Sequence, residues 1–192
     1  MINKIKLLDG SMSFPLEQLG YNLKNKLWTG MALISDPNII KNIHKDYINA
    51  GADYISTSTY QVSYDRLQNM GYQSSEIKKV FQKSVDLVKE AIKESESKKE
   101  IKIVGSFGPF ASYDPNASEY VGKYNSTDDE IKNFHLNNIN IIILIKCITN
   151  IILDILALSD KPNKFAIINN NNEDNATKCK IPNFTKLSPN TT

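Results

Sequence analysis

Short apolar runs that end in small polar residues alternate along this chain with longer amphipathic segments. The apolar runs cover residues 5–9, 53–59, 101–105 and 154–158, and apolar residues recur at helical spacing after residues 36 and 73. Such alternation is typical of βα units, in which successive strands lie parallel and the helices cover the sheet. The sequence therefore predicts an α/β fold, with the four strands paired in chain order and the helices on one outer side.

Terminal signals place three helices between these strands. Asp36 and Pro37 suit the start of a helix over residues 37–50, and Gly51 suits its end. A second helix begins at Ser74, and Thr127 starts a third in a capping box with the glutamate three residues later. His44 and His135 fall on helices away from the strand ends, so both are interpreted as structural.

The composition narrows the possible functions. The 192 residues suit one domain, and 23 basic against 21 acidic side chains leave a net charge of +2. This balance argues against a nucleic-acid or membrane-surface partner. The isoleucine-rich segment 139–152 is interrupted by polar residues, which favours a buried helix over a membrane span. No apolar run of signal-peptide length precedes Asp9, so the expected compartment is the cytosol.

Polar and small residues gather where the predicted strands end. Carboxyl ends of parallel strands line the ligand crevice in α/β proteins, so these residues are the candidate binding site. Taken alone they also fit a tight turn at Asp9 and strand propensity at the threonines. The candidates are Asp9 and Gly10 after the first strand, Thr57, Thr59 and Gln61 at the second, and Ser106 and Gly108 after the third.

Several of these motifs together resemble the homocysteine S-methyltransferase family over about the first two thirds of the chain. The matching motifs are Asp9-Gly10-Ser11-Met12, Ala50-Gly51-Ala52, Thr59-Tyr60-Gln61, Gly105-Ser106-Phe107-Gly108-Pro109, Ser118-Glu119-Tyr120-Val121-Gly122-Lys123-Tyr124 and Phe134-His135. The tyrosine-containing motif that follows the glycine motif is the most specific of these matches.

The resemblance implies a fold and a reaction. The fold is a TIM-type (β/α)₈ barrel of typically about 250 residues, of which this chain would hold about the first four units. Residues 1–158 would form the N-terminal part of the barrel, and 159–192 a divergent, Asn-rich tail of disordered composition. The reaction is methyl transfer from S-methylmethionine or S-adenosylmethionine to homocysteine, giving methionine, with zinc as the family cofactor. Asp9 would bind the substrate amino group, and the other candidates would shape the pocket.

The last third departs from the family. The family glutamate that helps hold the amino group is absent, and the three zinc cysteines fall beyond residue 192. Cys147 and Cys179 match neither cysteine position, so no metal ligand and no catalytic residue is assigned, and no zinc is expected to bind. We therefore expect a truncated, impaired family member. Two alternatives remain: a non-catalytic half-barrel that pairs with another chain, and a different barrel enzyme that uses Asp9 on another small ligand. The sequence fixes neither the methyl donor nor the oligomeric state.

Overall fold

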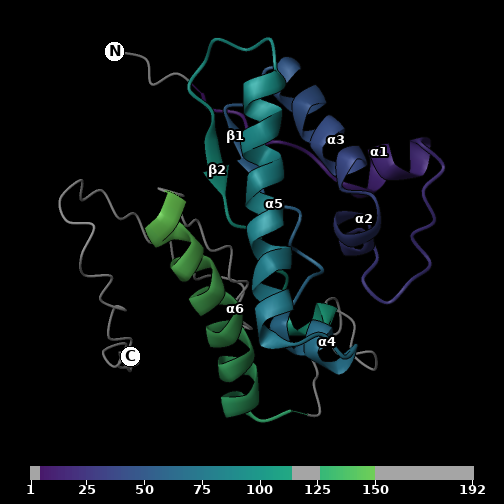
Figure 1. Ribbon diagram of the computed structural model, residues 1–192, viewed down its shortest axis with the longest axis vertical. Coiled ribbons are helices and arrows are strands. Elements are labelled where there is room, and N and C mark those ends of the chain that lie inside the picture. The colour runs from purple at the N-terminus through teal and green to yellow at the C-terminus, as the bar shows by residue number, and fades with distance from the viewer. Residues whose placement is uncertain (1–4, 114–125, 150–192) are drawn as a thin grey trace, which may run out of the picture.

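The computed structural model describes residues 5–113 and 126–149, which form helices packed on a small parallel sheet (Figure 1). The elements are, in order, α1 (Ser13–Gln18), α2 (Gly30–Ser35), α3 (Pro37–Asn49), β1 (Tyr54–Ser56), α4 (Tyr64–Asn69), α5 (Ser74–Glu94), β2 (Lys102–Val104), the 3₁₀ helix η1 (Phe110–Ser112) and α6 (Asp128–Thr149). The α/β class predicted from the sequence is confirmed for these residues.

The strands pair in parallel and in chain order, as predicted. β1 pairs with β2, with Ile55 opposite Ile103, and Leu8 forms a parallel bridge to Tyr54 on the other side of β1. The first run is therefore a single bridge and not a buried strand over residues 5–9. Leu7 and Leu8 are each 52% exposed, because among the described residues this run has β1 as a neighbour on one side only. The fourth expected strand, 154–158, and the tail 159–192 lie outside the described residues.

The two long helices that follow the strands form as predicted. Pro37 lies in the first turn of α3, and Gly51 just after the helix adopts a φ of 109°, a left-handed conformation that favours glycine. Asp36 occupies the cap position but makes no side-chain capping bond. α5 begins at Ser74 behind a capping box, in which the Gln73 N–H donates to Glu76 at 2.7 Å.

Other helices were only partly foreseen. α1, α2 and α4 have six residues each, which is too short to show a periodic pattern, and α1 replaces part of the loop predicted after Gly10. α6 joins the third predicted helix to the start of the isoleucine-rich segment, and the expected capping box is present at its start. Within residues 5–113 and 126–149, no helix has the length and apolarity needed to cross a membrane.

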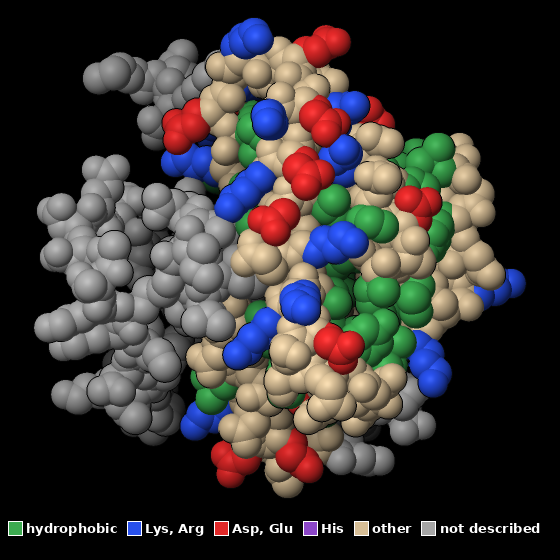
Figure 2. Space-filling view, viewed as in Figure 1, with side chains coloured by type: hydrophobic (Ala, Val, Ile, Leu, Met, Phe, Trp, Pro, Cys, Tyr) green, Lys and Arg blue, Asp and Glu red, His purple; other side chains and the backbone are tan. Residues whose placement is uncertain are grey.

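The helices α3 and α5 cover the same face of the sheet. Ile48 of α3, Ile55 of β1 and Val88 of α5 share one buried cluster, and a larger cluster extends from α5 towards α2 and α6. Figure 2 shows lysines and acidic side chains intermixed over α5, with apolar side chains beside them over α1 and α2. The packing fixes β1 and β2, whose carboxyl ends carry the candidate site.

Candidate functional site

A cleft of about 340 Å³ opens at the carboxyl ends of the strands. Its walls come from the turn after the first bridge, the loop before α2 and the ends of both strands. The lining residues are Leu8, Asp9, Gly10, Ser11, Met12, Ser13, Trp28, Thr29, Ser56, Thr57, Ser58, Tyr60, Gln61 and Ser106. Five of the seven predicted site residues are therefore brought together, whereas Thr59 and Gly108 lie elsewhere.

Asp9 places a carboxylate in this cleft, where the described side chains provide no cationic partner for it. Its two oxygens accept hydrogen bonds from the Ser56 backbone N–H at 2.9 Å and the Ser56 hydroxyl at 2.8 Å. Among the described side chains, those of residues 5–113 and 126–141, no lysine or arginine forms an ion pair with it. Burial raises the pKa of Asp9, and the Ser56 hydrogen bonds oppose that rise. The site thus presents a fixed, partly desolvated anion that can accept hydrogen bonds from a ligand cation.

Gly10 is required by the packing of the protein itself. A Cβ at this position would lie 2.8 Å from the Tyr47 hydroxyl oxygen, which is closer than side-chain packing allows. That hydroxyl donates to the Ser11 carbonyl at 2.7 Å and so fixes the turn after Asp9. Burial, together with the negative charge of Asp9, raises the pKa of Tyr47. The close neighbour of Gly10 within the protein is therefore Tyr47, and Gly10 also lines the cleft.

Thr57 and Thr59 join the ends of the two strands through Ser106. The Ser106 N–H donates to the Thr57 hydroxyl at 3.0 Å, and the Thr59 hydroxyl donates to the Ser106 carbonyl at 2.6 Å. The two hydroxyl oxygens lie 2.8 Å apart, so the Thr57 hydroxyl must donate to that of Thr59. Thr59 is fully buried and does not line the cleft, so its hydroxyl fixes the wall from behind.

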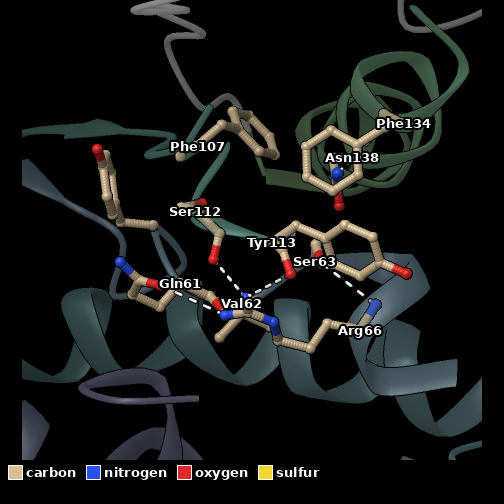
Figure 3. A pocket seen from close by; sticks show the side chains of 11 residues that line it. Gln61, Val62, Ser63, Arg66, Phe107, Ser112, Tyr113, Phe134 and Asn138 are labelled. Carbon is tan, nitrogen blue, oxygen red and sulfur yellow. Dashed lines mark hydrogen bonds between the residues drawn. The ribbon is translucent and has the colours of Figure 1, made fainter. Parts of the chain in front are cut away.

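Gly108 lies in a neighbouring small pocket, which we call the Arg66 pocket (Figure 3). Its N–H donates to the Tyr60 carbonyl at 3.0 Å, and a Cβ would collide with that carbonyl oxygen and with the Ser112 hydroxyl. The glycine thus allows two backbone segments to approach closely, and no ligand is needed to explain it. Gln61 lines both the Arg66 pocket and the cleft.

Trp28 lines the cleft and was assigned no role from the sequence. Its φ is 46°, which is unusual for a bulky residue, and its side chain is 43% exposed. The Asn25 amide holds this conformation by donating to the Trp28 carbonyl at 3.1 Å. Only its position as an isolated aromatic before a helix could have drawn attention to it. Ser58, also in the lining, has a buried hydroxyl without a hydrogen-bond partner among the described residues.

Comparison with known proteins decides the family. The profile described as Homocysteine S-methyltransferase matches residues 6–164 of this chain. The chain belongs to the homocysteine S-methyltransferase family. The motifs that carried the resemblance, from Asp9 to His135, lie within the matched region.

Relatives and solved structures of this family agree with that assignment. The homocysteine S-methyltransferase YbgG of Bacillus subtilis is 35% identical over 136 residues, which cover 67% of this chain and 43% of the relative. The metallated crystal structure of the homocysteine methyltransferase MmuM from Escherichia coli superposes with a TM-score of 0.65 and 29% identity, covering 74% of this chain and 51% of that one. The chain therefore spans about half the length of the relatives it matches.

This family generally uses zinc, so the described residues are compared with what a zinc site requires. Among the described side chains, those of residues 5–113 and 126–141, no three from His, Cys, Asp or Glu lie close enough to hold a metal ion. Cys147 falls in the part of α6 whose side chains are not described, and Cys179 lies outside the described residues. The described side chains thus form the Asp9 cleft and include no zinc donor set.

Proposed function

We propose that the cleft binds the amino-acid part of homocysteine, with Asp9 accepting hydrogen bonds from the substrate ammonium. The observation that carries this proposal is a fixed carboxylate that has no cationic partner among the described residues and opens into a cleft. Ser56 donates two hydrogen bonds to it, and burial raises its pKa. A ligand ammonium would supply the missing positive charge and lower that pKa.

The methyl donor is proposed to be a sulfonium, either S-methylmethionine or S-adenosylmethionine. Trp28 supports this part, because an exposed aromatic face at a cleft wall attracts a sulfonium cation as it does other cations. In the family reaction, a methyl group passes from the sulfonium sulfur to the homocysteine sulfur, and the thiol proton is lost to the surroundings.

Zinc in this family supplies a thiolate from the homocysteine thiol, which otherwise has a pKa near 8.5, about that of cysteine. Because the described residues do not supply a donor set for it, no step is derived through zinc. We propose that the 192-residue polypeptide binds homocysteine but transfers methyl groups more slowly than full-length relatives. We further propose that it acts in the cytosol.

A second candidate is a non-catalytic role in which this half pairs with another chain. The half-exposed Leu7 and Leu8 favour it, because their run bridges to β1 on one side and has no neighbouring strand on its other side among the described residues. An exposed strand edge of this kind is available for pairing with a further strand.

Calorimetric titration with L-homocysteine tests the binding proposal directly. The wild-type protein should bind and Asp9→Asn should not, while Asp53→Asn, a carboxylate at the opposite end of β1, serves as the matched control. Methionine formation is then assayed with each sulfonium donor and added zinc. Absence of homocysteine binding would refute the proposal, and fast turnover dependent on stoichiometric zinc would refute its slow-transfer part.

A further inference from the structure

Arg66 is the only arginine in the chain, and it lies outside the residues that the sequence pattern singled out. It belongs to α4 and is half-buried at the floor of the Arg66 pocket (Figure 3). One terminal nitrogen donates to the Gln61 carbonyl at 3.5 Å and to its amide oxygen Oε1 at 3.4 Å. The other donates to the carbonyls of Ser112 and Tyr113.

These acceptors come from two segments far apart in the sequence. Gln61 follows β1, whereas Ser112 and Tyr113 follow β2, so the guanidinium joins the exits of both strands. No carboxylate of the described residues accepts from it, and the neighbouring Asp65 instead accepts from Asn137 at 3.5 Å. The planar fork of arginine can reach several carbonyl oxygens at once, which the point charge of a lysine cannot reproduce.

The Arg66 contact also settles the orientation of the Gln61 amide. Because a guanidinium only donates, the atom facing Arg66 must be Oε1, and the Gln61 nitrogen is turned to the opposite side. Gln61 lines the Arg66 pocket on one side and the cleft on the other. Its two N–H donors therefore face away from Arg66 and are available to the cleft, where Asp9 supplies an acceptor.

We propose that Arg66 is a positioning residue, which fixes the Gln61 amide with its donors towards the cleft and holds the Ser112–Tyr113 segment against the end of β1. The cleft then offers an acceptor at Asp9 and a donor at Gln61, the polarity that matches the ammonium and carboxylate of an α-amino acid. This ligand assignment rests on the proposed function, whereas the positioning itself does not.

Hydrogen exchange of the intact 192-residue protein tests the positioning without any ligand. Arg66→Ala should accelerate exchange of the amides in residues 108–113 at least about tenfold, since four hydrogen bonds are lost. Arg66→Lys should restore little of the protection, because it keeps the charge and loses the fork. Gln68→Ala, an exposed position on the same helix, is the matched control and should change nothing. Unchanged exchange in Arg66→Ala, or full protection in Arg66→Lys, would overturn the proposal.

Gln61→Glu separates positioning from a merely structural role. The new carboxylate can pair with Arg66, so the urea midpoint of unfolding should stay the same or rise. The donors facing the cleft are lost at the same time, so L-homocysteine should bind about tenfold more weakly in calorimetry. Wild-type affinity in Gln61→Glu would overturn the ligand part of the proposal. If the wild-type protein binds no homocysteine, the proposed function fails, and the exchange result still decides the role of Arg66.

Discussion

Two aspartates lie at opposite ends of the same small sheet, and they differ in their ion pairs and in the direction in which their pKa is shifted. Asp53, at the start of β1, accepts a hydrogen bond from the Leu7 N–H at 3.0 Å and forms ion pairs with Lys6 and Lys99, each at 3.6 Å. The Leu7 hydrogen bond and the two lysines hold its pKa below the ordinary value. Asp9, at the cleft end, accepts two hydrogen bonds from Ser56 and forms no ion pair with the described side chains, and burial raises its pKa.

This difference indicates that Asp53 stabilises the fold, whereas Asp9 is available to a ligand. Asp53 is 6% exposed, and its charge is compensated by groups of the protein, so it fastens the first run to the loop before β2. Asp9 is held just as firmly by Ser56, but no cation of the described residues compensates it. A carboxylate that is oriented but uncompensated can gain most from a ligand ammonium.

The largest effect is expected from Asp9→Asn. The amide keeps an acceptor for Ser56 but loses the charge, so homocysteine affinity should fall on the order of a hundredfold, the worth of charged hydrogen bonds. Because a desolvated charge is removed, the urea midpoint of unfolding should stay constant or rise. Calorimetry and urea denaturation on one preparation measure both quantities. Loss of stability with unchanged affinity would reverse the roles assigned to the two aspartates.

His44 extends the comparison to a buried base whose ring nitrogens have no hydrogen-bond partner among the described residues. It is fully buried, neither ring nitrogen has a hydrogen-bond partner among the described residues, and burial lowers its pKa from 6.5 to about 4. The unfolded chain binds the proton near pH 6.5 and the folded chain only near pH 4, so stability falls as the pH drops through this window. Between pH 7 and pH 5 the loss should be about 2 kcal/mol.

Urea denaturation at the two pH values measures this loss, with His44→Leu as the comparison. Leucine has a similar volume and no titratable group, so the variant should lack this part of the pH dependence. The same acid-induced loss in His44→Leu would show that other groups cause it.

Thr59→Val should lower the free energy of unfolding by a smaller amount, because the Thr59 hydroxyl holds the cleft wall in place. Valine keeps the shape of the side chain but removes the donor to the Ser106 carbonyl and the acceptor for Thr57. The free energy of unfolding should fall by about 1–2 kcal/mol, as expected for unsatisfied buried polar groups. Ser75→Ala, at an exposed position on α5, serves as the control. Thr127→Val is unsuitable, because the Thr127 hydroxyl caps α6. Equal stability of Thr59→Val and the wild-type protein would contradict the hydroxyl chain.

The smallest effect on the cleft is expected from Asp53→Asn. The variant loses the attraction to Lys6 and Lys99, so the urea midpoint should fall modestly, and the difference from wild type should shrink at high salt. Homocysteine affinity should not change, because Asp53 lies at the opposite end of β1. A parallel loss of affinity would show that the two ends of the sheet are coupled.

The sequence predicted those features that depend on local signals. Gly51 marked the end of α3, Ser74 marked the start of α5, and the acid after an apolar run marked Asp9. It could not separate Thr57 from Thr59, because the loop after β1 turns one hydroxyl to the cleft wall and the other behind it. Nor could it predict that Gly108 lets the backbone pack against the Tyr60 carbonyl, since that contact joins segments nearly fifty residues apart.

A carboxyl-carbon NMR titration of Asp9 and Asp53 in one sample tests the central claim most directly. Asp9 should titrate above the ordinary value of 3.8 and Asp53 below it. Saturating homocysteine should lower the pKa of Asp9 and leave that of Asp53 unchanged. An Asp9 carboxyl that titrates at or below 3.8 without ligand, or that ignores homocysteine, would contradict the account.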